Sequence, residues 1–542
     1  MVYKFHYEAS AYSWGAVMLN TENALALSDF DHQVFAAVVP ADHYLRRVKT
    51  LVDFDRFRPR LNDLYSVTLG RPAIDPIRML KILFLRFHYK LSDRQVMERT
   101  KTDMVFRWFL DLSLHEAVPH HTEGTYFRKR IGVERWQQVF QDLVGLAREH
   151  GLVSDRLRLK DATHLFADAA EVTPLALAAQ VRERLLQAAE PLLPGWVAEQ
   201  RLRVAALRDT TAELADAERL AARVEHLREL AAQLRERVAA LPPGAEGPRQ
   251  RLDKALTLAA KLLADRDDPE APDRLGNAVD PDARTGLHGR YFLGYLLDMA
   301  IDADSELITA VNVLPGNGPE AADTITLIRQ EETAQGNQVE GVSLDGAGYN
   351  GPVLRELTDP AGLNLEVTVP PPKASPRTTF GPERFTLKVL ENGCGEVTCP
   401  AGQSTRQRER LKDKHGCRYT FKPKQCAGCS LREQCLQNPQ SAKGRTVIKN
   451  DYEAEYRRVE AKAATAAYIE TRRLHPKIER KLNDVVRHHG CRRACFRGRA
   501  KVLGQALLTA WVVNVKRLTK LIGDRLREAT PTIAVRAALA ET

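Results

Sequence analysis

Two aspartates follow apolar segments of the chain, where a carboxylate could take part in chemistry. Asp161 follows LRLK, and Asp345 follows GVSL and precedes the glycine-rich turn GAGYNG. A single aspartate in such a place is more often the cap of a turn or a helix. In an open α/β sheet, however, strand ends face the crevice in which ligands bind. Two aspartates at the ends of two predicted strands therefore form a candidate ligand-binding pair.

Together with a third acid, this pair could hold divalent metal ions. Mg²⁺ is usually held by a few carboxylates together with water and substrate phosphate. Two metal ions about 4 Å apart can activate water or a 3′-hydroxyl on one side of a phosphodiester and stabilise the leaving oxygen on the other. The candidates for the third acid lie on a later helical segment, and they are Glu460, Glu470 and Glu479.

These acids need a sheet to position them. Leu157, Leu159 and Asp161 alternate with other residues, which predicts a strand with one buried face that ends at Asp161. Further strands are predicted at 291–302, 305–317, 339–344 and 363–370, with a helix over 319–330. Alternating strands and helices are typical of a mixed α/β sheet. We therefore predict a core formed by 151–170 and 276–370.

The first 150 residues predict an all-helical region. Ser92, followed three residues later by Gln95, has the pattern of a capping box at a helix start. IRMLKILFLRFHY before it is apolar nearly all round, as in a buried helix. Basic and aromatic residues alternate in FRWFLDL and TYFRKRIG, so we expect a DNA-binding region over 1–150.

Residues 171–275 predict a helical insertion between two strands of the core. Apolar residues at spacings of four and three form a coiled-coil seam: Leu220, Val224, Leu227, Ala231, Leu234, Val238 and Leu241. PLLPG and LPPGAEG interrupt the helical pattern. The segment is therefore a helical hairpin or short bundle within the chain, or else a zipper between two chains.

The charge of the chain favours a polyanionic partner. The net charge is +10 over 542 residues, but residues 401–520 alone hold 29 Lys and Arg against 10 Asp and Glu. Such a concentration of positive charge suits nucleic acid, because neutralising phosphates releases counterions. No apolar run has the length of a membrane span, and we expect a cytoplasmic protein without a membrane partner.

All eight cysteines follow residue 393. Cys426 and Cys429 form a Cys-x₂-Cys pair, which is a good half-site for tetrahedral Zn²⁺. Cys435 and Cys399 could complete the site, and Cys417 competes as the fourth ligand. The other three, Cys394, Cys491 and Cys495, are less clearly tied to the cluster. We therefore expect a loop-rich, zinc-stapled segment over 371–448, followed by helices over 449–542.

The order of motifs resembles the DDE-type transposases of bacterial insertion sequences, specifically the insertion sequence 1182 family. The segments that carry the resemblance span about 450 residues, and they are ADHYLRRVKTLVDFD, GRPAIDPIRMLKILFLRFHYKLSDRQVMER, LKDATHLFADA, DPDAR, GYLLDMAIDADSELITAVNVLPGN, VSLDGAGYNG, CPAG, CAGCSLREQC and HPKIERKLNDVVRHHGCRRACFRG. Each motif alone is weak, but their shared order is specific.

The resemblance implies an RNase H-like core in which Asp161, Asp345 and Glu479 hold two Mg²⁺ or Mn²⁺ ions. It implies hydrolysis at the element ends, followed by attack of the freed 3′-hydroxyl on target DNA. The implied partners are the terminal inverted repeats, the target DNA and a second copy of the chain, in a bacterial cytoplasm near the nucleoid. Phosphate contacts are expected from Arg472, Arg473, Lys477, Arg480, Arg487, Arg492 and Arg493.

Three features depart from the family pattern. Related transposases commonly have Arg four positions before the glutamate and Lys seven after it, where this chain has His475 and Val486. The second acidic motif, Asp-Gly-Ala-Gly-Tyr, is one residue longer than the commoner Asp-Lys-Gly-Tyr. Two alternatives therefore stay open: a nuclease of the same fold that does not join strands, and a DNA-binding protein that has lost catalysis.

Overall fold

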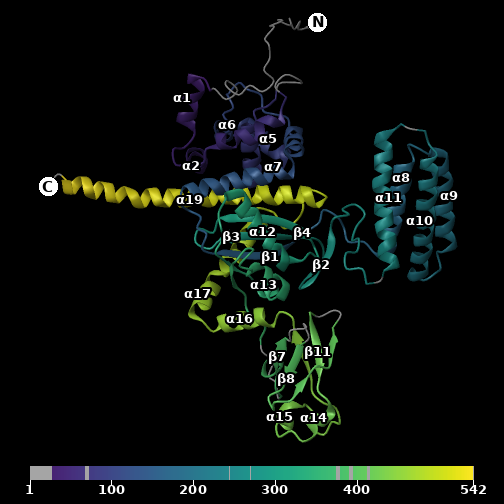
Figure 1. Cartoon of the computed structure of the whole chain (residues 1–542). Coiled ribbons are helices and arrows are strands. Elements are labelled where there is room, and N and C mark those ends of the chain that lie inside the picture. The colour runs from purple at the N-terminus through teal and green to yellow at the C-terminus, as the bar shows by residue number, and fades with distance from the viewer. Residues whose placement is uncertain are drawn as a thin grey trace.

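The structure is a computed structural model that describes residues 27–66, 73–242, 244–268, 270–373, 379–389, 395–411 and 415–540. Figure 1 shows a central sheet covered by helices, a helical bundle beside it and a small β-rich part beyond α16. A mixed α/β fold with an N-terminal helical region, predicted from the sequence, is confirmed. Within the described ranges, no helix is both long and apolar enough to cross a membrane.

The N-terminal region consists of helices whose apolar faces are buried. α5 (Asp93–Thr102) begins as predicted, since the Gln95 N–H donates to Ser92 Oγ and the Ser92 N–H donates to Gln95 Oε1. α4 (Pro76–His88) is buried along most of its length, as predicted for a helix that is apolar nearly all round. The other α-helices are α1 (Asp29–Val38), α2 (Tyr44–Leu51), α3 (Arg58–Leu61), α6 (Met104–Phe109) and α7 (Thr122–Glu149).

These helices share one hydrophobic core with the sheet and with the last helix, α19 (Arg499–Ala540). The buried ring of Trp511 on α19 lies 5.5 Å from the ring of Phe57 and 6.0 Å from those of Phe54 and Phe84. Edge-to-face aromatic pairs of this kind add to the stability gained from burial alone. The two ends of the chain therefore fold together rather than as separate units.

The central sheet has the order β2-β3-β1-β5-β6, and β4 also pairs with β3. β3 runs antiparallel to β1, β2 and β4, whereas β1, β5 and β6 are parallel. The sheet is thus mixed, as predicted. Its strands are β1 (Arg158–Phe166), β2 (Arg284–His288), β3 (Arg290–Asp302), β4 (Ile308–Pro315), β5 (Gly341–Ser343) and β6 (Glu366–Thr368), and α12 (Glu320–Gln335) and α13 (Gly351–Leu357) connect them.

The prediction that Asp161 ends its strand is wrong, because β1 continues to Phe166. On one side, β1 stays paired with β3 along its whole length. On the other side, its pairing with β5 stops at Leu159. Asp161 therefore lies within β1, just beyond the point at which the sheet opens between β1 and β5.

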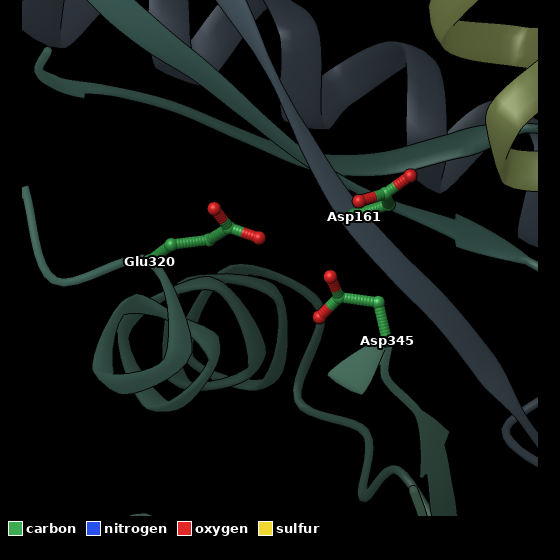
Figure 2. A group of neighbouring side chains, drawn as sticks. All are labelled: Asp161, Glu320 and Asp345. Carbon is green, nitrogen blue, oxygen red and sulfur yellow. The ribbon is translucent and has the colours of Figure 1, made fainter. Parts of the chain in front are cut away.

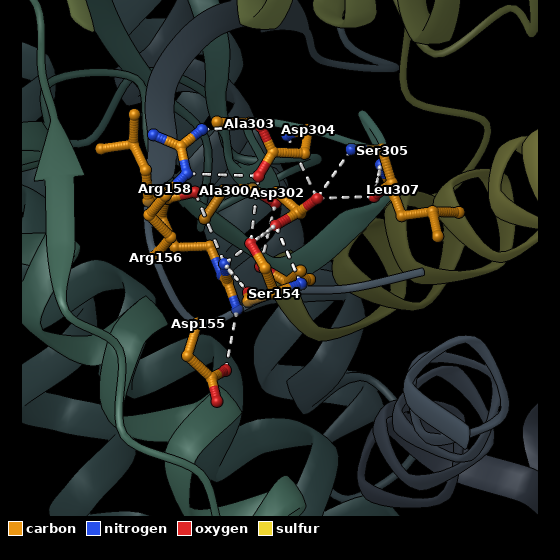
Figure 3. Close-up of polar contacts among 12 residues, drawn as sticks. Ser154, Asp155, Arg156, Arg158, Ala300, Asp302, Ala303, Asp304, Ser305 and Leu307 are labelled. Atoms are coloured by element: carbon orange, nitrogen blue, oxygen red, sulfur yellow. Dashed lines mark hydrogen bonds and ion pairs between the residues drawn. The ribbon is translucent and has the colours of Figure 1, made fainter. Parts of the chain in front are cut away.

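A buried ion network anchors the start of β1 (Figure 3). The guanidinium of Arg158 is fully buried and donates to Glu331 of α12 at 2.5 and 2.9 Å. It also lies 3.3 Å from Asp302 Oδ1. Asp302 also accepts hydrogen bonds from the N–H groups of Ser154 and Ser305. Removing one partner of a buried pair leaves an uncompensated charge, so the network fixes β1 against β3 and α12.

The predicted helical insertion is a bundle of four helices with its own core. These helices are α8 (Pro174–Ala189), α9 (Pro194–Thr210), α10 (Asp216–Ala239) and α11 (Glu246–Asp267). The seam residues Val224, Leu227, Ala231 and Leu234 of α10 are buried in that core. α10 packs against α8 and α11 of the same chain, so its seam is occupied without a second chain.

The cysteine-containing segment forms two small sheets with short helices. One sheet has β7 (Thr386–Val389), β8 (Gly395–Thr398) and β9 (Ser404–Thr405). The other has β10 (Arg408–Arg410), β11 (Gly416–Thr420) and β12 (Thr446–Asn450), and α14 (Pro423–Ala427) and α15 (Arg432–Cys435) lie between β11 and β12. The chain then returns to the central sheet through α16 (Glu453–Ala463), α17 (Ala466–Leu474) and α18 (Pro476–Asn483).

The predicted core-facing stripe of α19 contains one polar residue, Asn514, which is buried. Its Oδ1 accepts from the backbone N–H of Ile308 at 2.8 Å, and its Nδ2 donates to the carbonyl of Ile308 at 2.7 Å. Ile308 is the first residue of β4. Asn514 therefore satisfies both backbone groups at the place where β4 begins under α19.

Replacing Asn514 by Ala should destabilise the protein. The change leaves a buried backbone donor and acceptor of Ile308 without partners, which costs roughly 1–3 kcal/mol. We expect a lower midpoint of urea denaturation, measured by tryptophan fluorescence. The control is Lys520→Ala on the exposed side of the same helix, and equal midpoints for the two variants would contradict this role of Asn514.

Candidate active site

Three carboxylates from separate parts of the chain meet at the opening between β1 and β5. They belong to Asp161 of β1, Glu320 at the start of α12, and Asp345, and one oxygen of each lies within 4.8 Å of the others. Figure 2 shows the three side chains turned toward a common space. All three are half-buried. The sequence prediction that Asp161 and Asp345 lie close together agrees with this placement.

Local backbone structure fixes two of these acids. Asp345 follows β5 by two residues and caps the short helical turn Gly346–Gly348, since its Oδ1 accepts from the N–H of Ala347. The Oδ1 of Asp161 accepts from the N–H of Ala162 at 2.8 Å. Each carboxylate keeps lone pairs that these bonds do not use. Both aspartates are therefore oriented and still able to bind a cation.

Electrostatic repulsion acts within the group. Burial raises the pKa of Asp161 to about 7, and the charges of Asp345 and Glu320 contribute to this rise. Burial, together with the charge of Asp345, raises the pKa of Glu320 as well. An opposite charge placed among these groups would favour their ionised forms. Three hard oxygen donors at this spacing fit a divalent cation such as Mg²⁺ or Mn²⁺.

Lys160 lies next to Asp161 in the chain but is buried on the other face of β1. Its Nζ donates to the carbonyl of Glu320 at 2.8 Å and lies 3.1 Å from Asp298 Oδ2. Burial raises the pKa of Asp298 well above its usual range, and Lys160 opposes this rise. Lys160 therefore ties the first turn of α12 to β1 and sets the position of Glu320.

Glu320 was not predicted from the sequence as a site residue. The available signal was an acid directly after Pro319 at the start of a predicted helix, but acids are common at helix N-termini for electrostatic reasons. Nothing local distinguishes Glu320 from such a residue. It joins the site only because α12 begins beside β1.

Glu479, predicted to be the third acid, has an exposed side chain on α18. Within the described part of the chain, its carboxylate is not one of the three that lie within 4.8 Å of one another. The residue before α18 contacts β5, because His475 Nδ1 lies 3.2 Å from Oγ of Ser343, two residues before Asp345. The competing candidates Glu460 and Glu470 are exposed too, and Glu460 accepts a hydrogen bond from the hydroxyl of Tyr349.

The residues that depart from the family pattern have structural roles. Burial, followed by the nearby charge of Arg472, lowers the pKa of His475 to about 4, so the ring is neutral at neutral pH. Val486 is part of the main hydrophobic core. Neither side chain is exposed to bind a phosphate.

The predicted phosphate-binding residues divide into two groups. Three are engaged with the protein backbone: Arg472 donates to Leu344 O, Lys477 to Ala303 O and Arg492 to His164 O. Arg480 is exposed and lies 3.8 Å from Glu306. Arg473, Arg487 and Arg493 are exposed, and the described residues include no acid that pairs with their side chains. These last three therefore carry surface charges that no described acid neutralises.

The predicted zinc ligands also come together. Cys399, Cys426, Cys429 and Cys435 line one cavity between the two small sheets and α15, and Cys417 does not line it. Cys491 is buried in the main core, and Cys495 is exposed elsewhere. Cys394 lies outside the described residues.

Two family models match the chain. A model described as a transposase domain matches residues 33–130, and one described as a transposase DDE domain matches residues 398–519. The first range covers most of the N-terminal helices, and the second runs from the cysteine region through α18 into α19. No curated protein and no solved structure matched the chain.

Asp161→Asn should stabilise the protein at high pH. Below about pH 4 the carboxyl group of Asp161 in the wild-type protein is protonated in both the folded and the unfolded state. Between about pH 4 and 7 only the folded state keeps the proton, so wild-type stability falls as the pH rises. At pH 8 we expect the variant to have a free energy of unfolding higher by up to about 4 kcal/mol, with the difference vanishing near pH 4.

Urea denaturation at pH 4, 6 and 8 measures this effect, with Asp253→Asn on the exposed side of α11 as the control. A difference between Asp161→Asn and wild type that does not change with pH would contradict the electrostatic origin.

Proposed function

We propose that this chain, which belongs to the DDE-type transposases of insertion sequences, cuts the ends of its element and joins them to target DNA. The observation that carries the proposal is the meeting of Asp161 and Asp345 at one opening of the sheet. They lie 184 residues apart in the chain, with the four-helix bundle between them. Such a pair, in a chain matched by a transposase DDE domain, is the expected start of a metal-dependent phosphodiester site.

The arrangement of the sheet supports an RNase H-like core. β3 lies between the antiparallel strands β4 and β1, and β1 continues into the parallel strands β5 and β6. α12 makes the connection from β4 to β5. The acids then lie where the parallel part of the sheet opens, which is a common ligand site in sheets with parallel strands.

Asp161, Asp345 and Glu320 would hold Mg²⁺ or Mn²⁺. Metal ions bound there would activate water or a 3′-hydroxyl and stabilise charge at the phosphodiester. Glu479 is the third acid that the resemblance implies, and it lies on α18, which directly follows His475 beside β5. We therefore assign Glu320 as an additional ligand and Glu479 as the acid that completes the site on DNA.

The remaining residues prepare the site for the two steps. Lys160 and the β5–α13 turn fix the directions from which the carboxylates approach the substrate. The exposed Arg473, Arg487 and Arg493 would hold the DNA backbone beside them. Strand transfer exchanges one phosphodiester for another, so the chain needs no nucleotide as a source of energy. Two element ends must be held together, which requires at least two copies of the chain on DNA.

Metal binding gives the first test. In thermal denaturation without DNA, Mn²⁺ should raise the Tm of the wild-type protein, because a ligand that binds only the folded state stabilises it. The rise should be lost in Asp161→Asn and Asp345→Asn and reduced in Glu320→Gln. Glu340→Gln, at an exposed position directly before β5 and outside the group, is the matched control and should keep the full rise. An unchanged rise in Glu320→Gln would remove Glu320 from the metal site.

Catalysis gives the second test, in an assay with labelled element ends, a target plasmid and Mg²⁺. Substitutions Asp161→Asn, Asp345→Asn and Glu479→Gln should each lower end cleavage by about 100-fold or more, because each removes a ligand of the metal ions that would stabilise the transition state. DNA binding, followed by gel shift, should persist in all three.

The products separate the proposal from its two alternatives. Joined products support a transposase, cleavage without joining indicates a nuclease, and a shifted band without either indicates a protein that only binds DNA. Full cleavage by Glu479→Gln, together with loss in Glu460→Gln, would move the third acid to Glu460.

A further inference from the structure

Four thiols from three short segments surround one small cavity in the β-rich part of the chain. Cys399 follows β8, Cys426 lies in α14, Cys429 follows α14, and Cys435 ends α15. The cavity has a volume of about 20 Å³, and Phe385 and Phe421 also line it. A space of this size accommodates about one small atom.

The backbone presents these cysteines on tight turns. After Cys399, the N–H of Gly402 donates to the Cys399 carbonyl at 2.9 Å, and Gly402 has a φ of +78°, which favours glycine. In the second segment, the N–H of Arg432 donates to the carbonyl of Cys429 at 3.1 Å. Cys426 and Cys429 have the Cys-x₂-Cys spacing of a tetrahedral zinc site, and the turn at Cys399 brings a further thiol to the same cavity.

This part of the chain has little else to hold it together. Its strands have two to five residues. Among its described residues, the buried hydrophobic core has five members, which are Phe385, Val397, Tyr419, Phe421 and Val447. Small units with so few buried side chains usually require a metal or disulfides for stability.

Two arginines complement the thiols. Arg432 and Arg445 line the same cavity. The guanidinium of Arg432 donates to the carbonyls of Cys426, Pro439 and Ser441, each at 2.6 Å, and so fixes the loop around Cys426. The Nε of Arg445 is buried and has no hydrogen-bond partner among the described residues. A thiolate would give it an acceptor, and the two cations would offset the negative charge of four bound thiolates.

We propose that Cys399, Cys426, Cys429 and Cys435 bind one structural Zn²⁺ ion that joins the two small sheets. In the described part of the chain, no three of these sulfurs are as close together as the three carboxylates of the active site. Zinc would therefore draw the turn at Cys399 and the α14–α15 segment together. Four protein ligands would fill the coordination sphere of the ion and leave no position for a substrate. The zinc would therefore stabilise the fold and take no part in DNA cleavage.

The structure also decides between Cys417 and its competitors. Cys417 lies on β11, and its Sγ is 3.9 Å from Nη1 of Arg410. It packs at the edge of the small core but does not line the cavity. Cys417→Ser is therefore a matched control, because it removes a thiol from the same part of the chain and leaves the four ligands intact.

The test measures metal content in the full-length protein, purified without chelator and without added metal. Inductively coupled plasma mass spectrometry should find about one zinc per chain in wild type, in Cys417→Ser and in Cys495→Ser. Cys399→Ser and Cys435→Ser should each lose most of this zinc. A chelator should expose the segment 379–450 of the wild-type protein to limited proteolysis, and added Zn²⁺ should restore resistance.

Two outcomes would overturn the proposal: zinc content unaffected by Cys399→Ser and Cys435→Ser, or a zinc-free protein with a Cys426–Cys429 disulfide by mass spectrometry. The readouts do not depend on DNA cleavage. Asp161→Asn should keep its zinc, so a failure of the zinc site and a failure of the proposed activity are distinguished.

Discussion

Burial of neighbouring acidic side chains is the constraint that the packing of the central fold must offset. One oxygen each of Asp161, Glu320 and Asp345 lies within 4.8 Å of the others, and burial, with the charge of Asp345, raises the pKa values of Asp161 and Glu320, so ionising these two groups costs stability. Hydrophobic packing of the sheet against the N-terminal helices and α19 must offset this cost. A cation bound among the three carboxylates would offset this cost. The group therefore lowers the stability of the unbound protein, and binding would restore that stability.

β1 connects the site to the rest of the fold through its two faces. On one face, Arg158 and Lys160 are buried and both bind α12, at Glu331 in its last turns and at Glu320 in its first. On the other face, Asp161 lies at the opening toward β5. Arg158 and Lys160, which bind α12, thus lie on the same strand as Asp161, three residues and one residue before it. Any shift of β1 would move Asp161 and Glu320 together, which preserves their spacing.

The alternation of apolar residues predicts the strands around the site, because it is a local pattern. The approach of Asp161 to Asp345 is a contact between residues 184 positions apart, and it was expected from the general position of ligand sites at sheet openings and from the family resemblance, not from periodicity. Glu320 could not be predicted, since its role depends on where α12 begins in space. The continuation of β1 past Asp161 depends on pairing with β3, which is a long-range contact. Sequence spacing could not show whether Cys417 or Cys435 belongs to the cysteine cluster. That choice also depends on long-range contacts, because the fold determines which sulfur lines the cavity.

The basic segment that follows α18 explains how an insertion of four helices is tolerated between β1 and β2. Arg492 donates to Thr163 Oγ1 and to the carbonyl of His164, and Arg497 donates to the carbonyl of Asp168, so this segment holds the end of β1 and the loop that leaves it. Where the chain returns, the N–H of Gly498 donates to Asp280. Both ends of the insertion are therefore fixed by the segment that follows Glu479. Arg492 and Arg497 thus contribute to the fold, whereas the exposed side chains of Arg473, Arg487 and Arg493 have no acid partner among the described residues.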